Sequence, residues 1–287
     1  MTQVVIENPI INSPFDEPQR HFRFTEEGIT NEIVEARRIS SYFIPIAQPK
    51  KRGKQLALET QWTQDRIEEN KFINRLRNRV AMWRQGGYQG VTKATARLLE
   101  HWARPDRGRR LFFCQLEAVE TAIYIAEVAK RFGDAWIEND LRQANEQSNP
   151  LLNRIAIKMA TGSGKTVVMA MLIAWQALNK QANPQDARFS DAFLIVTPGI
   201  TIRDRLRVLW PNDPQNFYRV MDLAPPELLE DLGRIKIVIT NFHAFKPRER
   251  TSASKLAKSI LGQGEASPFT ETPDQMVRRV AHALRLL

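Results

Sequence analysis

The sequence has almost no cysteine, no long apolar run and fewer acidic than basic residues. Its 287 residues contain one cysteine, Cys114, so an internal disulfide and a cysteine-based metal cluster are both excluded. No apolar run approaches the roughly eighteen residues that a membrane span needs, and the N-terminus lacks a signal-peptide pattern. We therefore expect a cytoplasmic protein without a membrane partner.

The shortage of acidic residues is confined to one region. The chain has 42 Lys and Arg against 32 Asp and Glu, a net charge of +10. Residues 37–110 hold 18 of the basic and 6 of the acidic residues, a net of +12, which leaves −2 for the rest. An excess of Lys and Arg attracts polyanions, so this region favours double-stranded DNA as a partner; solubility is the simpler alternative.

The first 105 residues predict a basic, mainly helical accessory region. Several prolines before residue 60 predict extended or loop structure, with one strand around residues 41–46. Apolar residues at three- and four-residue spacing predict an amphipathic helix over residues 63–84, and a second helix is expected over 92–103. A Pro-Asp-Arg-Gly turn at residues 105–108 then predicts a boundary between domains 1–105 and 106–287.

Short apolar runs alternate with helical patterns beyond this boundary. Such alternation is typical of an α/β domain with a mostly parallel sheet and flanking helices. The predicted strands are residues 154–160, 192–197, 217–221 and 236–240. The predicted helices are residues 165–181, 201–209 and 226–232, and a final one that includes Val277, Val280 and Leu284.

A glycine-rich loop at residues 160–166, Ala-Thr-Gly-Ser-Gly-Lys-Thr, is the strongest motif. A predicted strand precedes it and an apolar helix follows it, which is the context of a phosphate-binding loop. The glycines let backbone N–H groups turn towards phosphates, and the helix start adds free donors. Lys165 would contact the β and γ phosphates, and Thr166 would bind Mg²⁺. We predict that ATP and Mg²⁺ bind here, through Thr161, Gly162, Ser163, Gly164, Lys165 and Thr166.

The loop departs from the general pattern at one position, since Met159 stands where that pattern has glycine. This variant, with Gly-x-Gly-Lys-Thr intact, resembles motif I of superfamily 2 helicases and translocases. Upstream, residues 111–119 resemble the Q motif of the same superfamily. The resemblance implies that the Gln115 amide hydrogen-bonds the adenine base; an ordinary polar position on a helix is the alternative.

Two further segments resemble motifs of this superfamily. Residues 193–201 resemble motif Ia, and residues 236–243 resemble the strand and turn that follow it. The resemblance implies contacts with the DNA backbone, although each segment alone fits any α/β domain. The residues that would make these contacts are Thr197, Pro198, Gly199, Thr201, Thr240 and Asn241.

Taken together, these motifs resemble the Res subunit of type III restriction enzymes. The resemblance extends to N-terminal tracts at residues 8–15, 37–46 and 83–88. It implies a RecA-like motor domain that uses ATP and Mg²⁺, translocates on double-stranded DNA and acts with a methyltransferase subunit.

One expected element is absent from the sequence. Superfamily 2 enzymes carry an Asp-Glu-x-His box after motif I, but no Asp-Glu pair follows Lys165, and the one such pair is Asp16-Glu17. We therefore expect an incomplete RecA-like domain that stops before motif II. Its catalytic site would not be complete, and Lys165 would contact the phosphates and the transition state. Alone, it should bind ATP weakly and not hydrolyse it.

Three functions remain open at this point. The first is the ATP-binding motor portion of a type III restriction endonuclease, a helicase-like hydrolase whose missing half a second chain could supply. The second is a non-catalytic fragment that binds DNA or a partner. The third is a small-molecule kinase, which would not need the basic region.

Overall fold

The computed structural model describes residues 6, 8–25, 28–44, 66–246 and 271–282. Its chain forms two compact units: residues 1–91 with 110–159, and residues 92–109 with 160–287. The predicted division into an accessory region, residues 1–105, and a motor domain, residues 106–287, concerns function and stays a prediction.

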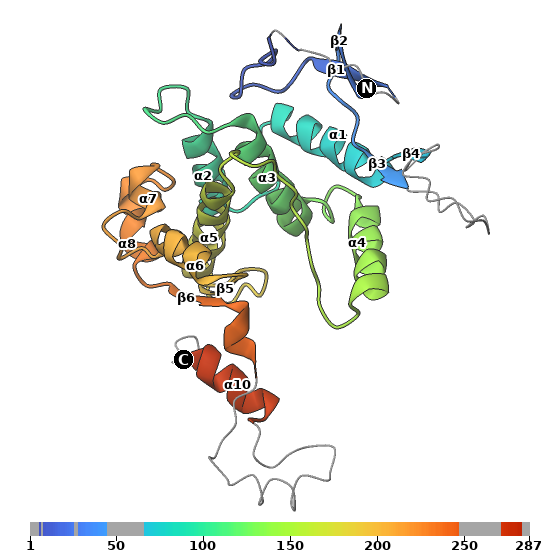
Figure 1. Cartoon of the computed structure of the whole chain (residues 1–287). Coiled ribbons are helices and arrows are strands. Elements are labelled where there is room, and N and C mark those ends of the chain that lie inside the picture. Colours follow the sequence, from blue (N-terminus) through green and yellow to red (C-terminus); the bar gives the residue numbers. More distant parts are fainter. Residues whose placement is uncertain (1–5, 7, 26–27, 45–65, 247–270, 283–287) are drawn as a thin grey trace, which may run out of the picture. The chain divides into compact units, whose positions relative to one another are not determined.

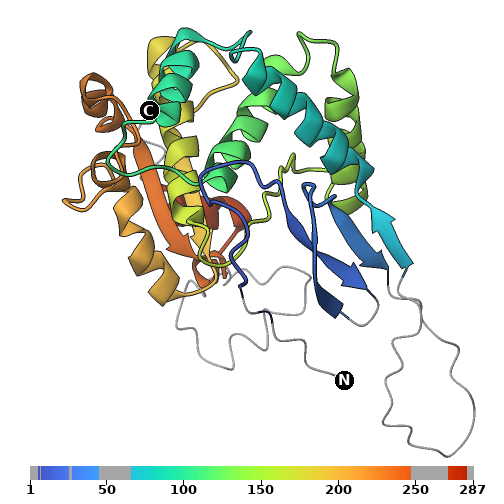
Figure 2. The ribbon, with the colours of Figure 1, turned by 90° about the horizontal axis from the view of Figure 1, so that it is seen from above.

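Two antiparallel hairpins lie in the first unit (Figure 2, blue to cyan). β1 (His21–Thr25) pairs with β2 (Gly28–Val34), and β3 (Ser41–Ile44) pairs with β4 (Arg66–Glu69). Of these four strands only β3 was predicted, and residues 45–46 of that prediction lie outside the described residues. Alternation at Phe22 and Phe24 was the available signal for β1.

The predicted helix over residues 63–84 was wrong at its start. Residues 66–69 form β4, where Ile67 pairs with Phe43, and the helix α1 (Lys71–Gln85) begins afterwards. Residues 63–65 lie outside the described part of the chain. Strand formation here depends on a partner strand far away in the sequence, and no local periodicity reports such a partner.

Three helices supply the core of the first unit. α1 buries Leu76, Val80 and Trp83, which recur at helical spacing, and it ends at Gln85, one residue beyond the predicted end. α3 (Phe113–Ile123) continues into the π-helical turn η1 (Tyr124–Val128), and α4 (Ala135–Ser148) follows. The Trp83 ring packs on Tyr124, with centroids 5.4 Å apart, and so joins α1 to η1.

The second unit is built around α5 (Lys165–Ala182), which is buried along most of its length. α2 (Lys93–Ala103) packs near it and begins as predicted, where the Thr92 side chain accepts the Thr95 N–H. The Asn179 amide of α5 donates to the Thr95 hydroxyl at 2.9 Å, and both groups are buried. This satisfied polar pair fixes how the two helices meet.

Short helices and 3₁₀ turns connect β5 (Ala192–Thr197) to β6 (Lys236–Asn241) along the chain, and α7, α8 and η2 among them contact α5. The predicted strand over residues 217–221 was wrong, because the segment forms α7, capped by the Asn216 side chain on the Arg219 N–H. The predicted helices at 201–209 and 226–232 are confirmed in broken form. The short elements are α6 (Ile200–Arg205), η2 (Leu206–Leu209), α7 (Phe217–Val220), η3 (Pro226–Leu228) and α8 (Leu229–Leu232).

Among the described residues, the sheet of this unit has two parallel strands, β5 (Ala192–Thr197) and β6 (Lys236–Asn241), which lie side by side (Figure 1). Both strands were predicted. The turn η4 (Phe242–Phe245) and the helix α10 (Pro273–Val280) follow. α10 contains Val277 and Val280 of the predicted last helix; Leu284 lies outside the described residues. A mixture of helices with a parallel sheet is consistent with the α/β class, although the sheet is small.

The segment before the glycine-rich loop corrects one prediction. Residues 154–160 were predicted to be a strand, yet they form no regular structure, and Ile155 and Ile157 are exposed. A strand exists only where a neighbour accepts its N–H and C=O groups, and no described strand pairs with this segment. Within the described ranges, no helix is both long and apolar enough to cross a membrane.

Candidate nucleotide-binding site

The glycine-rich loop has the backbone conformation that its glycines permit. Gly162 has φ +81° and Gly164 has φ +79°, both in the left-handed region that side chains disfavour. A Cβ atom on Gly162 would meet nothing within 4 Å, so the conformation, and not lack of space, requires glycine there. Left-handed residues alternating with others turn successive N–H groups to one side and create an anion-binding concavity.

The start of α5 adds donors to this concavity. The N–H groups of Val167 and Val168 both donate to the Gly164 carbonyl, at 2.9 and 3.3 Å, so the first helical turn closes on Gly164. The N–H groups of Lys165 and Thr166 have no backbone acceptor among the described residues. Free donors and the positive end of an eighteen-residue helix favour an anion at this position.

Two side chains close the loop on itself. The Lys165 ammonium and the Ser163 hydroxyl each donate to the Ala160 carbonyl, both at 2.7 Å. This carbonyl keeps the Lys165 ammonium beside the loop, and Thr166, half-buried, is the next residue of the helix. An ammonium, several backbone N–H groups and a hydroxyl are the donors that a triphosphate with Mg²⁺ needs, so the residues fit this ligand. Thr161 is exposed at the start of the loop.

Acidic ligands for a metal are missing from the described part of the chain. No group of three or more His, Cys, Asp or Glu side chains there is arranged to hold a metal ion. That the Thr166 hydroxyl binds Mg²⁺ stays a prediction.

Gln115 lies in the first unit and is already engaged. Its side chain is buried, and its carbonyl oxygen accepts the Phe112 N–H at 3.0 Å, which caps the start of α3. Its binding to adenine stays a prediction, and a ligand that used this oxygen would compete with the helix cap.

The residues predicted to contact DNA meet at the carboxyl ends of β5 and β6. Register pairs Thr197 with Asn241, so the two following turns are neighbours. The Thr197 hydroxyl donates to the Gly199 carbonyl at 3.0 Å, and the Asn241 side chain accepts the Ala244 N–H at 3.0 Å. These two side chains shape the turns, while Pro198 and Thr201 are exposed and Thr240 is half-buried. Their contacts with DNA stay a prediction.

An ionic cluster in the first unit was not predicted. Arg37 bonds to Glu17 at 2.7 Å and to Glu117 at 2.6 Å, which ties an N-terminal tract to α3. Arg84 bonds to Glu120 at 2.6 Å. The signal for this cluster was the presence of glutamates on an otherwise apolar helix, because a buried carboxylate needs a cation.

The cluster changes the acidity of the phenol that completes it. The Tyr88 hydroxyl donates to Glu120 at 2.6 Å. Burial, followed by the negative charge of Glu120, raises the pKa of Tyr88 well above its usual value. The phenol therefore stays protonated and acts as a donor to Glu120 at every ordinary pH.

Comparison with known proteins now gives the family. The family model described as "Type III restriction enzyme, res subunit" matches residues 111–261, which is 151 of the 287 residues. No curated protein and no solved structure matches the chain. The matched range contains the glycine-rich loop, α5, β5 and β6, and it is an N-terminal type of superfamily 2 helicase domain. The chain belongs to the Res subunit family of type III restriction enzymes.

Proposed function

We propose that this chain is the ATP-binding portion of a helicase-like DNA motor that serves type III restriction. One observation carries the proposal: within the family match, two left-handed glycines and the start of a buried helix present N–H donors beside the Lys165 ammonium. This is the arrangement that holds nucleotide phosphates.

Each loop residue has a separate role in this proposal. Gly162 and Gly164 keep the backbone curled, Lys165 neutralises charge on the terminal phosphates, and the Thr166 hydroxyl binds Mg²⁺. When bound, Mg²⁺ would reduce the mutual repulsion of the phosphates. The proposal is limited to binding, because no Asp-Glu pair follows Lys165 to position water for hydrolysis.

Binding of double-stranded DNA is the second part of the proposal. It is supported by the net charge of +12 over residues 37–110 and by the turns that meet at the ends of β5 and β6. Membership of the Res family adds a methyltransferase subunit as the proposed partner.

A non-catalytic DNA- or partner-binding fragment is the second candidate. The missing acidic pair and the two-stranded sheet favour it over a complete motor. The two candidates differ in one respect: a motor portion couples its DNA affinity to the nucleotide, and a simple binding fragment does not.

The experiment is a DNA-binding titration of the full chain with a duplex oligonucleotide, with and without a non-hydrolysable ATP analogue and Mg²⁺, at two salt concentrations. We expect steep loss of affinity at higher salt and a change in affinity on addition of the analogue. Lys165→Ala should abolish the change caused by the analogue and leave the salt dependence intact. If the wild-type affinity for DNA does not change when the analogue is added, this result would contradict the motor proposal and support the binding fragment.

A further inference from the structure

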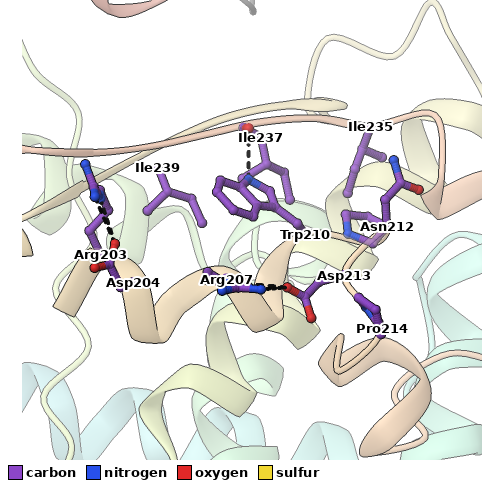
Figure 3. A pocket seen from close by; sticks show the side chains of 11 residues that line it. Arg203, Asp204, Arg207, Trp210, Asn212, Asp213, Pro214, Ile235, Ile237 and Ile239 are labelled. Carbon is purple, nitrogen blue, oxygen red and sulfur yellow. Dashed lines mark hydrogen bonds and ion pairs between the residues drawn. The ribbon is translucent and has the colours of Figure 1, made fainter. Parts of the chain in front are cut away.

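Cationic side chains of the second unit differ in what they bond to. A groove beside β6 is lined in part by arginines that already pair with aspartates, and Figure 3 shows Arg207 beside Asp213, with their charged groups 3.2 Å apart. The Lys165 ammonium instead donates to the neutral Ala160 carbonyl, and no carboxylate in the described ranges pairs with it. The charge of Lys165 is therefore available to an anion, provided that the ammonium can leave this carbonyl.

The Ala160 carbonyl closes a turn at the start of the glycine-rich loop. It accepts the Ser163 N–H at 3.4 Å, and Gly162, the third residue of the turn, has φ +81°. A positive φ at the third position is what a type II turn requires. The same carbonyl accepts the Ser163 hydroxyl and the Lys165 ammonium, each at 2.7 Å. One backbone oxygen therefore holds the turn and the ammonium together.

Two strong donors thus share one acceptor. A carbonyl oxygen has two lone pairs, which the Ser163 hydroxyl and the Lys165 ammonium occupy. The N–H bond at 3.4 Å is long and contributes least. If the ammonium leaves, the hydroxyl still bonds the oxygen; without the hydroxyl, the same departure would leave only the long bond. A polar group that loses its last good partner costs more free energy than one that keeps a second partner.

The two side chains also differ in their freedom to move. Lys165 is exposed and carries its ammonium on a flexible four-carbon stem, so it can turn from the carbonyl to a nearby anion. Ser163 is half-buried, and its hydroxyl is attached one carbon from the backbone of the turn itself. The hydroxyl therefore stays with the Ala160 carbonyl when the ammonium moves.

We propose that Ser163 is a positioning residue for nucleotide binding, which acts through Lys165. The Ala160 carbonyl keeps the ammonium beside the loop, and the Ser163 hydroxyl lowers the cost of moving that ammonium to the terminal phosphates. The turn stays closed because its acceptor remains bonded. This inference rests on the proposed nucleotide binding at residues 160–166, and it adds the residue that determines how readily Lys165 is released.

A purely structural role for Ser163 would give a different result. If the hydroxyl only shaped the turn, its loss would weaken nucleotide binding whether or not Lys165 were present. If it acts through Lys165, its loss matters only while there is an ammonium to release. A double-mutant cycle between the two positions separates these roles, because it measures how far the effect of one residue depends on the other.

The test is calorimetric titration of the full chain with Mg²⁺ and ATP. Ser163→Ala should bind ATP about fivefold more weakly than the wild type, equivalent to one hydrogen bond. Ser163→Thr keeps the hydroxyl and should restore the affinity to within about twofold of the wild type. In a Lys165→Ala background, adding Ser163→Ala should change the affinity by less than about twofold. Ser148→Ala, exposed at the end of α4, is the control and should bind like the wild type.

The outcomes separate this inference from the nucleotide binding on which it rests. No ATP binding by the wild type would overturn both. Wild-type binding with an equal affinity of Ser163→Ala, or with Ser163→Thr as weak as Ser163→Ala, would overturn the role of Ser163 alone. A loss of about fivefold in both backgrounds would also overturn that role, because the hydroxyl would then act without Lys165. The Ser163→Thr comparison decides by itself if Lys165→Ala binds too weakly to measure.

Discussion

Single buried charges in the first unit hold segments that are far apart in the sequence. Glu120 is 2% exposed and receives hydrogen bonds from Arg84 and from Tyr88. A carboxylate in such a place is tolerated because both partners are present, and removing it leaves Arg84 with the more distant Glu17, at 3.7 Å, as its ion-pair partner. The ionic cluster therefore stabilises the unit only when all of its members are present.

Replacing Glu120 tests this dependence. Glu120→Gln should lower the free energy of unfolding by about 3 kcal/mol, because the half-buried Arg84 guanidinium loses the nearer of its two carboxylates. Glu146→Gln, on the exposed face of α4, is the control and should change the free energy by less than about 0.5 kcal/mol. Denaturant titrations of the three proteins measure the difference. Similar values for both variants would show that the cluster contributes little.

Asp134 gives the unit a dependence on pH. Burial opposes its ionisation, but hydrogen bonds from Tyr124, Arg79 and Trp136 outweigh it and hold the pKa of Asp134 below its usual value near 3.8. The same contact, after burial, raises the pKa of Tyr124 to about 12. The stability from Asp134 is therefore present above its unfolded pKa, and it is lost as the pH falls through the lower folded value.

The corresponding variant is Asp134→Asn, which should lose about 1–3 kcal/mol of stability near neutral pH. This loss, relative to wild type, should shrink as the pH falls below about 4, because the wild-type carboxylate then becomes protonated too. Unfolding titrations across that pH range give the measurement, with Asp140→Asn on the exposed part of α4 as the control. A loss that stays constant down to acid pH would mean that the Asp134 charge has no part in it.

At the level of helices and strands, the sequence predicted the elements that are specified by neighbouring residues. α2, α5, β5 and β6 were predicted with nearly correct bounds, since each has its own periodicity, cap or apolar run. β4 was not, because its pairing with β3 is specified by residues more than twenty positions away. Residues 154–160 show the converse. They have an apolar strand pattern, but no strand among the described residues pairs with them.

The strand prediction for the segment that forms α7 was wrong for another reason. Its residues Phe217–Val220 have strand-like side chains, yet the Asn216 side chain accepts the Arg219 N–H and donates to the carbonyls of Pro211 and Asp213. These bonds stabilise a helical turn, and their contribution outweighs the preference of the apolar side chains for a strand. All of these partners lie within five residues of Asn216, so an asparagine directly before the segment was the available signal for a helical turn.

A prediction follows for this short helix. Asn216→Ala should cost about 2 kcal/mol, because it removes a cap and the amide N–H group that donates to the Pro211 and Asp213 carbonyls. Asn212→Ala, at an exposed position four residues earlier, is the matched control and should be nearly neutral. Thermal unfolding of both variants provides the comparison. Equal melting temperatures would contradict the role of Asn216 as a cap.

At the scale of the whole molecule, the candidate site was predictable in part. The loop at residues 160–166 could be found from sequence because its function depends on glycine, lysine and threonine at fixed spacing. The engagement of Gln115 and Thr197 in local hydrogen bonds could not, because both depend on where neighbouring backbone groups lie. The family match covers the loop, so the central claim for the molecule is that it binds Mg²⁺ and ATP there.

Calorimetric titration of the full chain with Mg²⁺ and ATP tests that claim most directly. We expect saturable binding by the wild type, at least about tenfold weaker binding by Lys165→Ala, and unchanged binding by Lys158→Ala, whose exposed lysine lies just outside the loop. Equal binding by the wild type and Lys165→Ala, or no binding by the wild type at millimolar ATP, would contradict it.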